Sequence, residues 1–149
     1  MSAKQRSTVC DTTKASYRYW TNVTLRYGDT DRQGHINNAA YCTLFESGRV
    51  DFLFGQQGES VAGEGKGFVI AKLTLDYLQE MNFPGTVEIG SKILSMGRSS
   101  FTIGQGAFIG DTCFSTAESI IVLIDEETKR STPITDSLRE ILERLLVST

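Results

Sequence analysis

The second half of the chain reads as four strand-forming stretches joined by short turns, and this limits the possible folds more than any other feature. The stretches are 69–77, 86–98, 100–110 and 113–125, where apolar, aromatic and β-branched residues recur. Connections this short favour antiparallel neighbours. The sequence therefore predicts one large antiparallel sheet, arranged as a meander.

One strongly apolar helix precedes these strands. Residues 39–54 carry apolar side chains at helical spacing (Tyr41, Leu44, Phe45, Phe52, Leu53). That spacing fits a helix buried over most of its circumference. Alternating residues at 17–27 predict a further strand, and Leu138, Ile141, Leu142 and Leu145 form the stripe of a terminal helix. Thr135, or Ser137 with Glu140, can cap that terminal helix.

A single sheet enclosing the apolar helix would bury both, which predicts an α+β domain. The length of 149 residues is enough for one domain with a real core. We expect a flexible polar tail at 1–16 and one domain at 17–149. Five glycines lie within 55–67 and predict a flexible loop that acts as a hinge or lid.

Composition excludes several functional classes. A net charge of −3 without a cluster of Lys or Arg offers no basic field for nucleic acid. No apolar run reaches the roughly 18 residues needed to span a bilayer. Three scattered cysteines do not make a disulfide framework, and a single histidine excludes a His-rich metal site. The start lacks the apolar core of a signal peptide. We expect a cytoplasmic protein with no metal and no prosthetic group.

The polar segment YGDTDRQGHINNAAYCTLFESGR, residues 27–49, is the candidate functional site. Asp and Gly favour turns, and Asn37 or Asn38 is suited to cap the helix that follows. The same segment places Asp31 and His35 near a helix N-terminus, whose free amides can stabilise negative charge on a carbonyl oxygen. A nearby carboxylate can attack that carbonyl or activate water, and a histidine can move a proton. From the residues alone, both interpretations stay open.

This segment resembles the signature of the hotdog-fold acyl-CoA thioesterases of the 4-hydroxybenzoyl-CoA thioesterase type. The matching positions are Asp29, Asp31, Gly34, His35, Asn37, Asn38, Tyr41 and Glu46. Residues 68–108 and 117–134 resemble the strand region of the family, so the resemblance covers nearly everything from Tyr17 onward. It implies a hotdog fold, in which an antiparallel sheet wraps a long central helix, and hydrolysis of a thioester to an acid and a thiol.

The resemblance also implies roles for individual residues. Asp31 would carry the chemistry, as nucleophile or general base, and the backbone amide of Asn38 would polarise the thioester carbonyl. His35 matches a working histidine of the acyl-carrier-protein thioesterases, and Gln33 would help to hold water. Glu46 would either face the site as a second carboxylate or pair with Arg49 or Arg18 as a structural bridge.

Further residues would bind the substrate. Arg98, Ser99 and Ser100 match positions that contact coenzyme A in the family, and an Arg with hydroxyls suits a phosphate; a solvated turn is the alternative. Asn37 and Tyr41 complete the expected binding residues. Cys42 is a poor nucleophile because the only histidine lies seven residues away in the sequence. A Ser-His-Asp hydrolase is disfavoured as well, because the sequence has no G-x-S-x-G elbow.

Three other functions compete with acyl-CoA hydrolysis. They are hydrolysis of an acyl-carrier-protein thioester, non-catalytic binding of acyl thioesters, and a hotdog dehydratase, which the D-x-D-x-x-G-H pattern disfavours. The partner expected is the acyl-CoA substrate, whose coenzyme A is no separate cofactor. Hotdog thioesterases pair, and an open sheet has edges that must be covered. We therefore expect a homodimer or homotetramer with its site between two subunits.

Overall fold

The computed structural model describes residues 11–54 and 60–146 of the chain. In chain order the elements are a 3-10 helix (Lys14–Ser16), β1 (Tyr19–Thr24), a second 3-10 helix (Tyr27–Asp29), α2 (Ala40–Leu53), β2 (Lys66–Tyr77), β3 (Thr86–Met96), β4 (Ser100–Ile109), β5 (Thr112–Asp125) and α3 (Asp136–Glu143). The expected helices and strands are therefore present, with the first strand shorter than predicted. No helix in the described part of the chain is long and apolar enough to cross a membrane.

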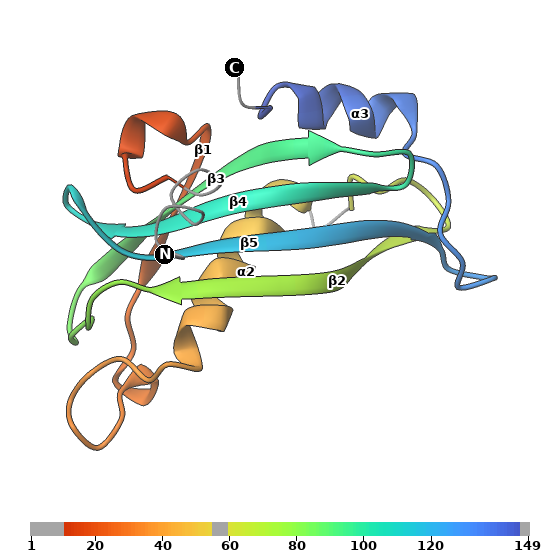
Figure 1. Cartoon of the computed structure of the whole chain (residues 1–149). Helices are drawn as coiled ribbons and strands as arrows, with labels where there is room; N and C mark the ends of the chain where they lie inside the picture. The colour runs from red at the N-terminus through yellow and green to blue at the C-terminus, as the bar shows by residue number, and fades with distance from the viewer. Residues whose placement is uncertain (1–10, 55–59, 147–149) are drawn as a thin grey trace, which may run out of the picture.

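The five strands form one antiparallel sheet in the order β1-β3-β4-β5-β2, with α2 lying across one face (Figure 1). The predicted meander is confirmed for β3, β4 and β5. It is wrong for β2, which pairs with β5 at the far edge instead of with β3. The connection 78–85 forms no hairpin because it pairs with the segment before α2, where the Ile36 N–H donates to the Met81 carbonyl at 2.7 Å.

The helix α2 packs closely on the sheet. Its buried side chains include Leu44, Phe45 and Phe52, of which Phe45 is fully buried, so truncating Phe45 to Ala would cost about 3–5 kcal/mol. Gly48 allows the close approach, because a Cβ there would lie 2.6 Å from the Ile89 side chain. One apolar helix against a five-stranded antiparallel sheet is the hotdog fold, and the expected fold class is confirmed.

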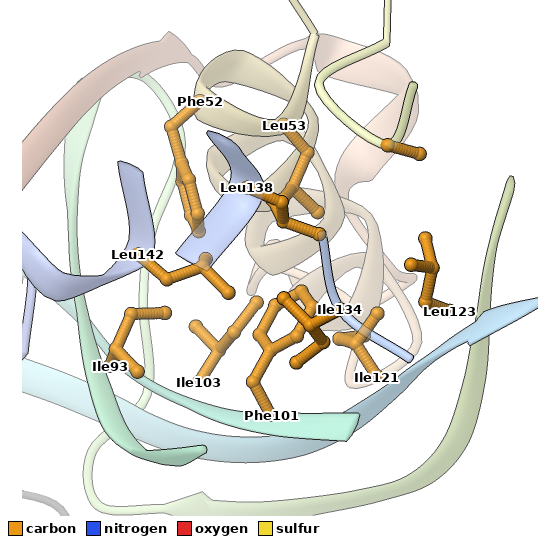
Figure 2. Close-up of a cluster of buried hydrophobic side chains, with 11 residues drawn as sticks. Phe52, Leu53, Ile93, Phe101, Ile103, Ile121, Leu123, Ile134, Leu138 and Leu142 are labelled. Atoms are coloured by element: carbon orange, nitrogen blue, oxygen red, sulfur yellow. The ribbon is translucent and has the colours of Figure 1, made fainter. Parts of the chain in front are cut away.

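The terminal helix α3 closes the core at the far end of α2. Thr135 caps it, with its hydroxyl accepting a hydrogen bond of 3.2 Å from the Leu138 amide, as one of the two expected caps. Leu138 and Leu142 are fully buried. Figure 2 shows them pointing into a cluster with Phe52 of α2 and the strand residues Ile93 and Ile103.

The two expected flexible segments are described only in part. Residues 1–10 and 55–59 lie outside the described residues, so the lid at 55–67 stays a prediction. The described end of the tail is attached to the sheet, because Lys14 forms an ion pair of 2.6 Å with Glu88. The described end of the loop is a turn that contains the fully buried Ala62. Lys14 thus lies against the sheet, while the boundary between tail and domain stays a prediction.

Candidate active site

A tight turn shapes the polar segment ahead of α2. The Asp31 amide donates to the His35 carbonyl at 2.8 Å, and the Gly34 amide donates to the Asp31 carbonyl at 3.1 Å. Gly34 has a φ of 86°, a conformation that residues with a Cβ rarely adopt. The glycine therefore permits the turn that brings Asp31 and His35 together.

The carboxylate of Asp31 is anchored through one oxygen. Its Oδ1 accepts hydrogen bonds from the amides of Gln33 at 2.9 Å and His35 at 3.2 Å. Its Oδ2 accepts no hydrogen bond from residues 11–54 or 60–146. Asp31 is half-buried and lines a cavity. One oxygen thus fixes the side chain while the other remains available to a substrate or water.

Asp29 is engaged quite differently. It is buried, and its Oδ1 accepts from the Arg26 guanidinium at 2.7 Å while its Oδ2 accepts from the Arg26 amide at 2.8 Å. These hydrogen bonds with Arg26 hold the pKa of Asp29 below its ordinary value. The Asp29 carbonyl also accepts from the Asn37 amide at 2.8 Å. Asp29 therefore holds the turn and leaves chemistry to Asp31.

The start of α2 leaves one backbone amide unused. The Asn37 side chain accepts from the Ala39 amide at 2.9 Å, and the Asn37 carbonyl accepts from the Ala40 amide at 2.9 Å. The Tyr41 amide donates to the Asn38 carbonyl at 3.3 Å. Within the described chain, the Asn38 amide has no acceptor, and Asn38 lines the same cavity as Asp31. A free amide at a helix N-terminus suits a partly negative oxygen.

The end of β2 fixes this helix start. The Tyr77 hydroxyl donates a hydrogen bond of 3.0 Å to the Asn38 carbonyl. The Tyr77 ring meets the buried ring of Tyr41 edge to face, with 5.0 Å between centroids. Burial raises the pKa of Tyr41. Tyr77 therefore ties the last residue of β2 to the residue whose amide is unused.

His35 has a carboxylate partner. Its Nε2 lies 3.2 Å from Oε2 of Glu80, in the connection between β2 and β3. The His35 side chain is partly buried, whereas Glu80 is mostly exposed. The Glu80 carboxylate can orient the imidazole through this contact. Together with Asp31, this places two carboxylates and one imidazole around one cavity.

The cavity measures about 370 Å³. It is lined by Asp31, Gln33, His35, Ile36, Asn38, Tyr41, Tyr77, Leu78, Gln79 and Glu80. The structure thus gathers five of the ten residues expected from the sequence around one space. Asn37 does not line the cavity, but its side-chain oxygen accepts a hydrogen bond from the Ala39 amide and so helps to fix the start of α2.

Four expected residues lie elsewhere in the chain. Glu46 lines a different cavity, and no ion pair with Arg49 or Arg18 occurs in the described structure. Ser100 of β4 and Val69 of β2 both pair with Val122 of β5, so they lie at the same level of the sheet. The cavity lies at the Tyr77 end of β2. Eight residues of strand separate those two positions, about 26 Å. Arg98, Ser99 and Ser100 therefore do not reach the Asp31 cavity of their own chain.

Sequence reasoning missed the wall that follows β2. Tyr77, Leu78, Gln79 and Glu80 line the cavity, although no motif marks them. They reach it because residues 81 and 82 pair with residues 35 and 36. A tyrosine at a strand end, with the polar pair Gln79 and Glu80 two residues further on, was the only available signal. Among the described residues, no three or more of His, Cys, Asp or Glu are grouped to hold a metal ion.

Known proteins are similar to this chain in sequence and in fold. Residues 25–142 match the thioesterase-like superfamily. The acyl-CoA thioester hydrolase YbgC of Escherichia coli O6:H1 is 30% identical over 108 residues, which cover 69% of this chain and 79% of that protein. The uncharacterized protein YsmA of Bacillus subtilis (strain 168) is 27% identical over 132 residues, covering 87% of this chain and 88% of that protein.

A solved structure agrees with the fold. The PA5185 protein from Pseudomonas aeruginosa strain PAO1 superposes with a TM-score of 0.82 at 22% identity, covering 92% of this chain and 97% of that one. The family match includes the whole polar segment, α2 and the strands β2 to β5. This chain belongs to the thioesterase-like superfamily.

Proposed function

We propose that this protein hydrolyses acyl-CoA thioesters to a free acid and coenzyme A. The observation that carries the proposal is the unused Asn38 amide at the start of α2, in the same cavity as the available Asp31 oxygen. Membership of the thioesterase-like superfamily supports thioester hydrolysis as the reaction class. The name of the relative YbgC, an acyl-CoA thioester hydrolase, supports coenzyme A as the leaving group.

The Asn38 amide would stabilise the transition state. In thioester hydrolysis the carbonyl oxygen gains negative charge when a nucleophile adds to its carbon. A fixed N–H donor and the positive end of a helix stabilise that charge without reorganising. Removing one such donor typically costs about 100-fold to 1000-fold in kcat. Tyr77 and Asn37 would keep the amide in place, through their hydrogen bonds at 3.0 and 2.9 Å.

Asp31 would supply the attack on the carbonyl carbon. As a general base, its free Oδ2 takes a proton from water while the water oxygen adds to the carbon. As a nucleophile, Oδ2 adds directly and forms an anhydride that water then cleaves. In both routes the C–S bond breaks, the thiolate leaves and is protonated, and the acid is released. The anchoring of Oδ1 by two amides suits either role.

His35 and Gln33 would complete the proton transfer. The imidazole of His35, oriented by Glu80, can donate a proton to the leaving thiolate or orient the attacking water. Gln33 lines the same cavity and can hold that water with its side-chain amide. Tyr41 would form the wall of the site.

Coenzyme A would be gripped by a second copy of the chain. The strand β2 is an edge of the sheet, and unpaired edges must be covered or paired. Two-fold antiparallel pairing of β2 strands would place the Val69 end of one chain beside the Tyr77 end of the other. Ser100 is in register with that Val69 end, and Arg98 and Ser99 directly precede it in the chain. They would then reach the partner's cavity and could bind phosphate there.

Hydrolysis of matched substrates tests the proposal. Purified protein is incubated with aliphatic and aromatic acyl-CoAs, including 4-hydroxybenzoyl-CoA, and with acyl groups on a carrier protein, while release of free thiol is followed. We expect turnover of acyl-CoAs. Turnover of carrier-bound acyl groups alone would reassign the substrate, and binding without turnover of either would make this a non-catalytic acyl-thioester binding protein.

A further inference from the structure

A second cavity of about 530 Å³ lies between α2 and the first half of β2. Most of its wall is apolar, formed by Val50, Leu53, Phe54, Phe68, Val69, Ile70, Ile121 and Ile124. Arg49 also lines it, although that residue is only 9% exposed. The Arg49 nitrogens without a hydrogen bond keep access to the cavity, since the Ser119 hydroxyl is the only buried unpaired side-chain atom in the described chain. A charge beside a largely apolar wall is unusual, because it is costly to remove from water without a partner.

The guanidinium of Arg49 is poorly satisfied. Within the described chain, its one hydrogen bond runs from Nη1 to Oε1 of Gln105 at 3.5 Å, the outer limit for such a bond. No carboxylate in that part of the chain lies within 4 Å of it. Gln105 is itself held in place, with its Nε2 donating to the Phe45 carbonyl and to the Ser91 hydroxyl, each at 3.0 Å. Arg49 therefore rests against a fixed neutral group and keeps donors for a ligand.

The charges around the cavity favour an anion. Lys66 and Lys129 line it together with Arg49, against the carboxylates of Glu46 and Glu126. Glu46 attracts the Arg49 charge from a distance, whereas burial lowers the pKa of Arg49. A carboxylate matches the planar donors of an arginine and can accept two of them. An apolar body on that carboxylate would match the rest of the wall.

The two cavities share no lining residue, but one face of α2 runs from the candidate active site to this cavity. Asn38 and Tyr41 line the first cavity, Glu46 and Arg49 line the second, and Cys42 is exposed on the same helical face between them. From Asn38 to Arg49 the helical rise is about 16 Å, and helical side chains lean toward the N-terminus, so the span to the Arg49 guanidinium is about 14 Å. An extended acyl chain of roughly ten to twelve carbon atoms spans that distance.

We infer that Arg49 binds a carboxylate at the far end of the acyl group, so that the preferred substrates are ω-carboxy acyl-CoAs of this length. This inference rests on the proposed function, because it places the thioester at Asn38. The apolar wall holds the methylenes, and the guanidinium pairs with the terminal carboxylate. A chain that ends in a methyl group would leave Arg49 unpaired beside it.

The test compares straight-chain acyl-CoAs with ω-carboxy acyl-CoAs of equal length, from about 6 to about 14 carbons. We expect the wild-type protein to favour the ω-carboxy substrate in kcat/KM by about tenfold or more at roughly ten to twelve carbons, since an unpaired buried polar group penalises the wrong substrate. Arg49→Met should reverse this preference while retaining turnover of the straight chain. Arg49→Lys should keep part of it, and Arg18→Met, which changes an exposed arginine, should keep all of it.

A binding measurement separates this inference from the proposed function. The melting temperature is measured with free decanoate and with decanol, for the wild type and for Arg49→Met. Stabilisation by decanoate alone, lost in Arg49→Met, supports carboxylate binding at Arg49 even if no thioester is cleaved. A wild-type preference for methyl-ended chains would overturn the inference, as would an unchanged preference in Arg49→Met. A change in oligomeric state alone in Arg49→Met would overturn it too and assign Arg49 to a subunit contact.

Discussion

The Tyr77 hydroxyl donates a hydrogen bond of 3.0 Å to the backbone carbonyl of Asn38. This contact joins the end of an edge strand to the turn that leads into α2, at the residue whose amide is free to donate to a substrate oxygen. The two residues are 39 positions apart in sequence. The geometry of the candidate oxyanion site therefore depends on how β2 ends.

Removing that hydroxyl should slow turnover. In Tyr77→Phe the ring still packs on Tyr41, but the Asn38 carbonyl loses its donor. We expect kcat to fall by about threefold to tenfold, the worth of one hydrogen bond, with little change in KM. Tyr27→Phe is the matched control because Tyr27 is 80% exposed. Equal kcat and KM values for the two variants would show that the Tyr77 hydroxyl has no role in turnover.

Asp29 should affect stability more than turnover. Its folded-state pKa lies below the ordinary value because of Arg26, so its carboxylate stabilises the fold above the unfolded pKa of about 4. That contribution is lost as pH falls through the folded-state pKa. Asp29→Asn should therefore lower the urea midpoint at pH 7, and the difference from the wild type should disappear in acid. A difference that persists undiminished at about pH 2 would contradict this role.

His35 should contribute to turnover through its side chain. The imidazole lines the cavity of Asp31, and its Nε2 lies 3.2 Å from the Glu80 carboxylate. His35→Ala should lower kcat by about tenfold or more, because a positioned acid or base is worth at least that much. Glu80→Gln removes the carboxylate that orients the imidazole and should lower kcat less. A kcat of His35→Ala within threefold of the wild type would mean that His35 only shapes the turn.

The active protein should be an oligomer that pairs through β2. Val69 on this edge strand is 42% exposed. Val69→Lys should weaken the pairing, so light scattering during turnover should show smaller particles and lower activity at the same concentration. Asn22→Lys, on the opposite edge strand β1, is the control. A monomer that keeps full activity at the lowest assay concentration would refute the shared site.

The sequence predicted the parts of the site that lie close together along the chain. The turn residues 29–38 could be placed because their capping and turn preferences are local. The wall of Tyr77 and Glu80 could not, because it depends on β2 pairing with β5 rather than with β3. Short connections favour the nearest strand, yet the residues of 78–85 pair with the segment before α2 instead.

The expected role of Glu46 in the site stays a prediction, and helix geometry does not favour it. Eight residues separate it from Asn38, about 12 Å along the helix axis, and Glu46 lines the second cavity with Arg49 rather than the Asp31 cavity. The location of Arg98 could not be judged from sequence spacing, because it depends on strand pairing. The register places its neighbour Ser100 at the Val69 end of β2, about 26 Å of strand from the Tyr77 end that lines the Asp31 cavity.

The most direct test of the central claim is the turnover number of Asp31→Asn with saturating acyl-CoA. The substitution keeps the size of the side chain and an oxygen able to accept from the Gln33 and His35 amides, but it removes the charge. We expect kcat to fall by about 100-fold to 10,000-fold with an unchanged melting temperature. The kcat of Asp29→Asn should fall far less. An Asp31→Asn variant within threefold of the wild type would contradict the assignment of Asp31 as base or nucleophile.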